Sequence, residues 1–307
     1  MRLGIIGLGK MGGNMLLRLA AAGHDVRGFD RNPDTTERLA REVGFEAPAS
    51  VAELVASLEA PRVVWLMLPA GDVTEGAIAE LKSMLVPGDT VVDGANSLFK
   101  DSIRRADDLA AAGIGFVDAG VSGGVWGRDN GYALMVGGNA ESFAAVRPAI
   151  EDLAPARDAG WLHCGPAGSG HFVKMVHNGI EYGMMQAYAE GFALMKGREE
   201  FDLDLAAIAE MWRHGSVVRS WLLDLTADFL RQDQELSGIE PVVADSGEGR
   251  WTVMEAIEQG IPAPAIGAAV MMRHASQGSG DYANKILSMM RKGFGGHAVV
   301  PRDGDVE

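Results

Sequence analysis

The chain has 307 residues, of which 47% are hydrophobic and 22% charged, a composition typical of a globular protein long enough for two domains. Its 42 acidic and 27 basic residues give a formal net charge of -15, which argues against nucleic acids and anionic membranes as partners. Cys164 is the single cysteine of the sequence, so no intramolecular disulfide can form. Because a strand-like run begins at Leu3 and no apolar run is long enough to span a membrane, we expect no signal peptide and a cytoplasmic location.

The first half of the chain alternates short β-branched runs with amphipathic segments. Such alternation predicts crossover units and a mostly parallel sheet. The expected strands are Leu3–Ile6, Val26–Phe29, Val63–Leu68, Thr90–Val92, Gly115–Asp118 and Leu134–Val136, and helices expected between them include Gly12–Ala22, Pro33–Glu42 and Ala106–Ala112.

The pattern changes near His163, after which the runs become long and helical. The expected helices there are His171–Lys196, Leu205–His214, Val217–Arg231, Thr252–Gln259, Ala263–Ser276 and Tyr282–Lys292. The predicted fold class is an α/β Rossmann-type dinucleotide-binding domain, residues 1–163, followed by an all-α helical domain, residues 164–297, and a polar tail, residues 298–307.

A Gly-x-Gly-x-x-Gly motif follows the first expected strand and opens the first expected helix. Its first glycine permits a tight turn, its second lets the backbone approach a pyrophosphate, and its third lets helix and strand pack closely. The helix N-terminus would attract the anion. The expected cofactor-binding residues at this turn are Gly7, Leu8, Gly9, Lys10, Met11 and Gly12.

The second expected strand ends in an acidic residue, Asp30, 18 residues beyond Gly12. A carboxylate there can accept hydrogen bonds from both adenosine ribose hydroxyls and would repel a 2′-phosphate. The motif therefore favours NAD as the cofactor. The guanidinium of Arg31, also assigned to the cofactor site, could tolerate the phosphate and keeps NADP open.

Three further segments follow expected strands, where ligands of such sheets bind. Leu68, Pro69 and Ala70 are expected to contact the cofactor. Asn96 is expected to reach both cofactor and substrate, although a turn explains a loop asparagine equally well. The third segment offers a hydroxyl and bare backbone amides that suit a carboxylate or a polyol, with a tight glycine turn as the alternative. Its residues are Ser122, Gly123 and Gly124.

The segment from Gly168 to Gly183 predicts one long helix whose polar residues share a face. These residues are Lys174, His177, Asn178 and Glu181. Their offsets of zero, three, four and seven stack them on one stripe. The other positions are mostly apolar, which is typical of a buried helix, and burying four such polar groups is costly unless they pair or bind something. We interpret the stripe as a functional site, with a satisfied buried polar network as the alternative.

Together these motifs resemble the decarboxylating 6-phosphogluconate dehydrogenase family, whose wider group includes the 3-hydroxyisobutyrate-type dehydrogenases. The motifs are the glycine turn, DGANS at 93–97, GVSGG at 120–124 and KMVHNGIEY at 174–182, supported by GEGRWT at 247–252 and FGGH at 294–297. The resemblance covers nearly the whole chain and is to the shorter form of the family, which lacks much of the long form's C-terminal helical region.

The resemblance implies oxidative decarboxylation of 6-phosphogluconate to ribulose 5-phosphate with reduction of NAD(P). Lys174 would accept the hydroxyl proton if burial lowers its pKa, and would then donate a hydrogen bond to the new carbonyl. Glu181 would protonate the enol as general acid. His177 and Asn178 would orient the hydroxyls and carboxylate of the substrate.

The family pattern also assigns residues to the phosphate end of the substrate. They are Tyr182, Arg273, Arg291 and His297. In the family the tail reaches into the neighbouring subunit's site, which implies a homodimer or homotetramer. One departure is that Ser246 and Glu248 stand where the long form has a phosphate-binding lysine and threonine. A sugar acid without phosphate therefore stays an alternative substrate.

Two other functions remain open. A β-hydroxyacid dehydrogenase of the 3-hydroxyisobutyrate type would oxidise its substrate without decarboxylation, which His177 and Glu181 argue against. A catalytically idle nucleotide-binding sensor would be expected to lose the polar stripe. The scattered histidines show no metal-ligand spacing, so a metal-free site is expected.

Overall fold

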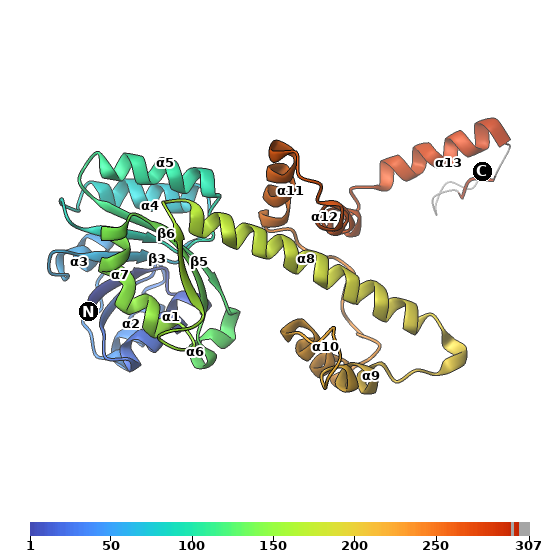
Figure 1. Ribbon diagram of the computed structural model, residues 1–307, viewed down its shortest axis with the longest axis horizontal. Helices are drawn as coiled ribbons and strands as arrows, with labels where there is room; N and C mark the ends of the chain where they lie inside the picture. Colours follow the sequence, from blue (N-terminus) through green and yellow to red (C-terminus); the bar gives the residue numbers. More distant parts are fainter. Residues whose placement is uncertain (296–297, 301–307) are drawn as a thin grey trace. The chain divides into compact units, whose positions relative to one another are not determined.

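The chain divides into two compact units, a first unit, Met1–His177, and a second unit, Asn178–Glu307. The computed structural model describes residues 1–295 and 298–300. The first unit is α/β, and the described part of the second unit is helical (Figure 1). The predicted fold class, a Rossmann-type domain followed by an all-helical one, is confirmed.

A seven-stranded sheet forms the centre of the first unit. Its strand order is β2-β1-β3-β4-β5-β6-β7, and every neighbouring pair is parallel except β5 with β6. The mostly parallel sheet was therefore predicted correctly. The strands are β1 (Arg2–Ile6), β2 (Asp25–Phe29), β3 (Val63–Leu66), β4 (Thr90–Asp93), β5 (Gly115–Ser122), β6 (Ala133–Gly138) and β7 (Trp161–Gly165).

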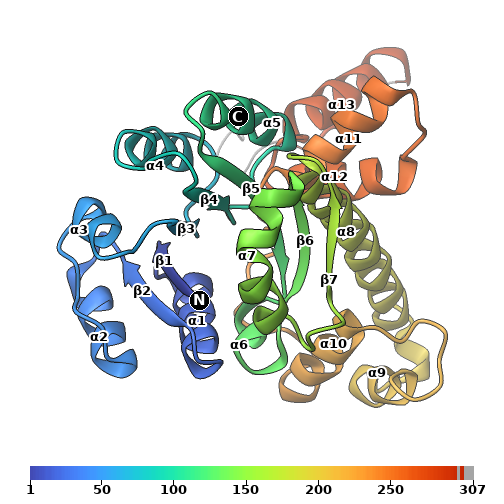
Figure 2. The ribbon, with the colours of Figure 1, turned by 60° about the vertical axis from the view of Figure 1, so that its left-hand side comes forward.

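Helices cover both faces of this sheet. Successive β1 residues alternate between two apolar cores, Ile5 in one and Ile6 in the other, as expected for a sheet buried on both sides. Helices α1, α2 and α7 contribute to the first core and α3, α4 and α5 to the second, with α7 lying over β5 and β6 (Figure 2). The helices are α1 (Lys10–Ala21), α2 (Pro33–Val43), α3 (Val51–Ala56), α4 (Asp72–Lys82), α5 (Phe99–Ala110), η1 (Gly124–Trp126), α6 (Gly127–Asn130) and α7 (Ala140–Leu153).

The largest differences from the predicted strands are at β5 and β7. β5 extends to Ser122 rather than ending at Asp118, because its last residues pair with antiparallel β6. The edge strand β7 was not predicted. It pairs only with β6, and Trp161–Gly165 contains no β-branched residue to mark it as a strand.

The second unit is built around the long helix α8, which begins in the first unit. Tyr188 and Phe192 of α8 pack with α9 and α10 in one small core, and Tyr182 packs with α12 in another. Helix α10 begins at Trp221, not at the predicted Val217, because the Ser220 hydroxyl caps it by accepting from the Leu223 amide. The helices are α8 (Ser169–Lys196), η2 (Glu199–Phe201), α9 (Leu205–Trp212), α10 (Trp221–Gln232), α11 (Glu248–Gln259), α12 (Pro264–Ser276) and α13 (Asp281–Gly295).

Helix α8 is less buried than its apolar composition predicts. Ile180 is 54% exposed and Met184 is 39% exposed in the single chain. The expectation of a helix buried on most sides is therefore wrong for the single chain, because α9–α12 cover only part of its surface. None of the helices in the described residues is long and apolar enough to cross a membrane.

Candidate active site

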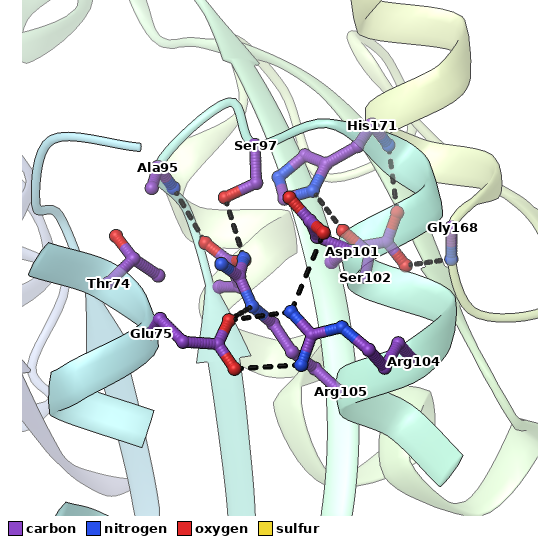
Figure 3. Close-up of polar contacts among 12 residues, drawn as sticks. Thr74, Glu75, Ala95, Ser97, Asp101, Ser102, Arg104, Arg105, Gly168 and His171 are labelled. Atoms are coloured by element: carbon purple, nitrogen blue, oxygen red, sulfur yellow. Dashed lines mark hydrogen bonds and ion pairs between the residues drawn. The ribbon is translucent and has the colours of Figure 1, made fainter. Parts of the chain in front are cut away.

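The start of α8 is fixed to the sheet by Asp118, a buried carboxylate in β5. Its two oxygens accept hydrogen bonds from the backbone amides of Gly168, at 2.7 Å, and His171, at 2.8 Å. The imidazole Nδ1 of His171 lies 2.7 Å from the Ser102 hydroxyl of α5 (Figure 3). The two Asp118 contacts pair amides at the N-terminus of α8, and the three contacts together fix its first turn against β5 and α5.

Lys174 lies one helical turn further along α8 and is only 5% exposed. A Cβ atom added to Gly120 of β5 would stand 2.3 Å from the Cβ of Lys174. The lysine stem therefore packs directly on the strand, and only glycine leaves room for it. The predicted base is thus held in a buried position, where its ammonium form loses hydration.

Asn96 contacts Val121, the residue of β5 that follows Gly120. Its Oδ1 accepts a hydrogen bond from the Val121 amide at 3.1 Å, and its backbone has a φ of 51°, a left-handed conformation that is uncommon outside glycine. Because Lys174 contacts Gly120 and Asn96 contacts Val121, the structure brings two predicted site residues to neighbouring positions on β5.

Two more predicted residues lie beside Lys174. The His177 ring has its Nδ1 3.5 Å from the Lys174 Nζ and its Nε2 3.5 Å from the Ser122 hydroxyl. Gly123 and Gly124 follow Ser122 with positive φ angles of 143° and 54°, and Gly124 begins the short helix η1. Ser122, Lys174 and His177 thus form one polar cluster in the first unit, and Asn96 binds the backbone of Val121, the residue that precedes Ser122.

The glycine turn has the shape that a dinucleotide pyrophosphate requires. A Cβ on Gly12 would stand 2.0 Å from the Gly7 carbonyl oxygen, so helix and strand approach too closely for a side chain. A Cβ on Gly9 would meet no atom within 4 Å, which leaves open space over the backbone there. Gly9 begins α1 without a side-chain cap, so the first amides of α1 are left for an anion. These residues fit the predicted cofactor.

Asp30 is oriented toward this turn. Its carboxylate accepts hydrogen bonds from the Leu8 amide at 2.7 Å and from the Asn32 amide at 2.8 Å. A carboxylate can accept about four hydrogen bonds, so the two backbone donors fix Asp30 without exhausting it. Arg31 is exposed, and its side chain makes no hydrogen bond or ion pair with the described residues.

The segment after β3 is held from α4. The hydroxyl of Thr74 donates to the carbonyl of Pro69 at 2.8 Å, and Gly71, with a φ of 89°, begins the helix. Leu68 is half-buried and Ala70 exposed. The loop therefore has a defined position at the carboxyl edge of the sheet.

In the second unit, two residues predicted for the phosphate end, Tyr182 and Arg273, lie together. The Arg273 guanidinium stacks 3.5 Å from the centre of the Tyr182 ring and donates to the Ala244 carbonyl at 2.8 Å. The Tyr182 hydroxyl is 2.9 Å from the Ser246 hydroxyl, which donates to the carboxylate of Glu248. The two departures from the long form therefore lie in one network with a predicted binding residue.

The remaining predicted residues are distributed as follows. Asn178 and Glu181 lie on the continuous helix α8, in the second unit, with Glu181 partly exposed. Arg291 is exposed on α13 and makes no hydrogen bond or ion pair with the described residues. His297 lies outside the described residues. The described residues contain no group of three or more histidine, cysteine or acidic side chains able to hold a metal ion.

Sequence reasoning missed the buried residues that support the site, above all Asp93, Arg105 and Asp118. Asp93 and Asp118 are fully buried and lie opposite each other on neighbouring strands β4 and β5. The signal available in the sequence was an aspartate at the end of each of two apolar strands, because a buried carboxylate must have partners. The partners themselves, such as Gly168 for Asp118, are too distant in the sequence to be recognised.

Comparisons with known proteins agree with this geometry. The NAD binding domain of 6-phosphogluconate dehydrogenase matches residues 2–164, and the C-terminal domain of 6-phosphogluconate dehydrogenase matches residues 170–294. The chain is 42% identical over 305 residues to the NAD(+)-dependent, decarboxylating 6-phosphogluconate dehydrogenase of Haloferax volcanii, covering 99% of this chain and 100% of the relative.

Longer proteins are similar as well. The chain is 37% identical over 287 residues to an NAD(+)-dependent, decarboxylating 6-phosphogluconate dehydrogenase of Bacillus subtilis, covering 89% of this chain and 61% of the relative. The solved Plasmodium falciparum 6-phosphogluconate dehydrogenase, studied with NADP+ and with 6-phosphogluconate, superimposes with a TM-score of 0.82 at 28% identity, covering 100% of this chain and 67% of that one. Full coverage of one relative and partial coverage of the others identifies the short form.

Proposed function

Because this chain belongs to the 6-phosphogluconate dehydrogenase family, we propose that it oxidises and decarboxylates 6-phosphogluconate with NAD as its preferred oxidant. The product is ribulose 5-phosphate. Similarity over the full length to a decarboxylating relative supports the activity. The structural observation that carries it is the buried Lys174, packed on β5 at Gly120 next to the strand residue that Asn96 contacts.

Lys174 is the general base of the oxidation. When bound, NAD supplies the acceptor for the hydride that leaves C3 of the substrate. Lys174 takes the proton of the C3 hydroxyl, and its burial keeps bulk water away from this transfer. His177 and Ser122, which lie against each other beside Lys174, donate to or accept from the neighbouring hydroxyls and hold C3 toward the lysine.

The same lysine assists the loss of carbon dioxide. Oxidation leaves a ketone two carbons from the carboxylate carbon, and protonated Lys174 donates a hydrogen bond to its oxygen. The electron pair of the breaking C1–C2 bond moves onto this carbonyl, which gives an enediol and carbon dioxide. Glu181 then donates a proton to C2 as general acid, while Lys174 takes back the proton of the enediol hydroxyl at C3. The proton left on Lys174 makes up for the one that Glu181 gives to carbon.

Asp30 supports NAD over NADP. Its carboxylate is held beside the glycine turn by the amides of Leu8 and Asn32, and it retains acceptor capacity for a ribose diol. A 2′-phosphate at that position would face a fixed negative charge. Arg31 has no anchoring contact among the described residues, so it offsets this repulsion only weakly.

The substrate phosphate binds beside Tyr182 and Arg273. Stacking on the ring holds the guanidinium in one plane, and a planar guanidinium can donate two parallel hydrogen bonds to a phosphate. Glu248 adds negative charge to this network through Ser246. Arg273 therefore carries more of the phosphate affinity than Ser246 or Glu248 does.

The active form is a homo-oligomer of at least two chains, located in the cytoplasm. Helix α10 exposes Trp221, Leu225 and Phe229, which repeat every fourth residue and so form one apolar face. Leu225 and Phe229 of this face, together with Leu236 and part of α8, line a cavity of about 530 Å³. A second copy of the chain is the partner that would cover it.

The assay that tests this function follows NADH and carbon dioxide together. Wild-type protein is incubated with 6-phosphogluconate labelled at C1, and with unlabelled gluconate in parallel, each with NAD or NADP. We expect one labelled carbon dioxide for each NADH, with 6-phosphogluconate preferred over gluconate and NAD over NADP. NADH without carbon dioxide would identify a plain β-hydroxyacid dehydrogenase, and cofactor binding without turnover would identify a sensor.

A further inference from the structure

Helix α5 carries a buried arginine, Arg105, that is 2% exposed. Its Nη1 lies 2.8 Å from Asp93 Oδ2, and the Asp93 side chain is fully buried. Its Nε lies 2.9 Å from Glu75 Oε2 on α4. One guanidinium thus links the end of β4 to the first turn of α4 (Figure 3).

The β4 end of this link continues into the loop that holds Asn96. Asp93 Oδ1 accepts from the Ala95 amide at 3.0 Å, and Oδ2 accepts from the Ser97 hydroxyl at 3.0 Å. Arg105 Nη1 also donates to the Ser97 hydroxyl at 3.0 Å. The residues on both sides of Asn96 are therefore fixed to the same buried carboxylate.

These contacts matter because Asn96 has a left-handed φ of 51°. Asparagine adopts this conformation more readily than other residues with a side chain, but extended conformations stay open to it unless the surroundings fix the loop. The anchoring at Ala95 and Ser97, with the Val121 amide bound to Asn96 Oδ1, supplies that constraint. Loss of one anchor would let the loop relax.

The α4 end of the link reaches the other loop at the carboxyl edge of the sheet. Glu75 follows Thr74, whose hydroxyl holds the Pro69 carbonyl. Arg104 fixes Glu75 from a second side by donating to both of its oxygens at 2.8 Å. Any shift of Glu75 would therefore be transmitted to the loop that contains Pro69.

We propose that Arg105 is a positioning residue of the reaction, which holds the Asn96 loop and the Pro69 loop at one fixed spacing. The proposal rests on the proposed function, because that function gives both loops a ligand to contact. Arg105 touches neither substrate nor cofactor itself. It acts through Ser97 and Asp93 on one side and through Glu75 on the other.

Only a guanidinium can make both links at once. Its Nε and Nη1 donate in different, rigidly related directions, whereas an ammonium is a single point donor on a flexible stem. Arg105→Lys retains the positive charge beside buried Asp93, so we expect the fold to be preserved. The single ammonium group must then serve either Asp93 or Glu75, and one of the two contacts is lost or lengthened. Misplacement of positioning groups by about 1 Å can lower a rate by as much as a hundredfold.

The test compares Arg105→Lys and Ser97→Ala with Lys82→Gln. Lys82 is the matched control, because its ion pair with Asp108 at 2.6 Å also joins α4 to α5 but lies at the opposite end of α4. We expect Arg105→Lys to lower kcat about tenfold and to weaken NADH binding by a similar factor. Lys82→Gln should retain both values.

A kinetic isotope effect separates positioning from mere stability. With substrate deuterated at C3, the isotope effect on kcat should rise in Arg105→Lys and Ser97→Ala, since hydride transfer becomes slower relative to product release. A loss of folded protein would scale every rate and leave the isotope effect unchanged. An unchanged isotope effect together with unchanged NADH affinity would overturn the proposal.

Hydrogen exchange supplies a readout without turnover. The amide of Val121 donates to Asn96 Oδ1, so release of the loop should increase deuterium uptake in the peptide that contains Val121. Arg105→Lys should show this increase and Lys82→Gln should not. If wild-type protein failed to turn over 6-phosphogluconate, the proposed function would fail, and the positioning role would still be decided by this exchange and by NADH affinity.

Discussion

The first unit buries charged groups in fixed networks, whereas the second unit leaves many apolar side chains in solvent. Asp93, Arg105, Asp118 and Lys174 are all 5% exposed or less. In the second unit the two apolar cores contain only eight buried residues, while Phe229 is 44% exposed. Buried charge is stable only where it is paired, and Asp93 and Asp118 have their partners within the first unit.

The contrast indicates that the two parts of α8 have different roles in the two units. The helix begins in the first unit, fixed by Asp118, and there it holds Lys174, the proposed base, against the sheet. Its continuation in the second unit carries Glu181 and Tyr182. Changes in the first unit should therefore act on chemistry in each chain, whereas changes on the apolar faces of the second unit should act through assembly.

The largest effect is expected for Lys174→Met, which keeps most of the apolar stem and removes the amine. Because general base catalysis contributes roughly a thousandfold, turnover should fall by about that factor. NAD affinity should be retained, since the glycine turn is untouched. NADH formation and fluorescence titration measure the two quantities.

Lys82→Met is the matched control for that change. Lys82 ends α4 and pairs with Asp108, so its loss tests the same substitution away from the site and from the apolar face of α10. Its turnover should equal that of the wild type. If Lys174→Met kept turnover within about tenfold of the wild type, Lys174 would not be the base.

Glu181→Gln tests whether the second unit also supplies chemistry. The amide cannot donate the proton that the enediol needs, so steady-state turnover should fall about a hundredfold. Because the oxidation precedes this step, rapid mixing should show a burst of one NADH per site before slow turnover. Glu190→Gln, on the exposed continuation of α8, is the control, and absence of the burst would remove Glu181 from the protonation step.

Asp30→Ala should change cofactor choice without changing the chemistry. Loss of the carboxylate removes the ribose contacts and the repulsion of a 2′-phosphate, so the preference for NAD over NADP should narrow about tenfold. The ratio of kcat/KM for the two cofactors measures this. Asp30→Ala also removes the acceptor of the Leu8 amide. The control is Asn32→Ala, a substitution in the same segment that keeps the Asp30 carboxylate and should keep the preference for NAD. An unchanged ratio would locate the ribose acceptor elsewhere.

Sequence patterns predicted the elements whose signals are local. The glycine turn, the parallel strands and the stripe on α8 each follow from spacing along a short segment. The edge strand β7 was missed because Trp161–Gly165 has neither β-branched residues nor clear alternation. The extension of β5 to Ser122 was missed because it depends on pairing with β6. The sequence of one strand does not predict which strand it will pair with.

The same distinction applies to the site. Lys174 and His177 were predicted because their spacing along one helix is visible in the sequence. Their position against Gly120 and Ser122 of β5 was not, since that contact joins segments about 50 residues apart. Arg105 was missed because nothing in α5 distinguishes a buried arginine from the exposed Arg104 beside it.

Phe229→Glu tests whether the apolar face of α10 is an interface. A charge there should cost little in a lone chain but should prevent a second copy from covering the face, so the oligomer should dissociate. Sedimentation measures the assembly. The Tm of the wild type should rise with protein concentration, whereas the Tm of Phe229→Glu should not. Val86→Glu is the control, because Val86 is a similarly exposed apolar residue of the first unit. An unchanged oligomer in Phe229→Glu would exclude this face as the interface.

The smallest effect concerns the acid stability of the link at Glu75. Hydrogen bonds from Arg104, reinforced by Arg105, hold the pKa of the Glu75 carboxyl at about 2, below its ordinary 4.5. Since the folded pKa is the lower one, the ionised carboxylate stabilises the fold fully above pH 4.5, and this contribution is lost as pH falls toward 2. Glu75 is 42% exposed, so screening limits the contribution to about 1 kcal/mol or less.

Glu75→Gln removes this titration and tests the argument. Urea unfolding measures the difference in free energy of unfolding between wild type and variant. This difference should be largest above pH 4.5 and should shrink below it. A difference that stays constant across that range would show that the carboxylate is not held in its charged form by these arginines.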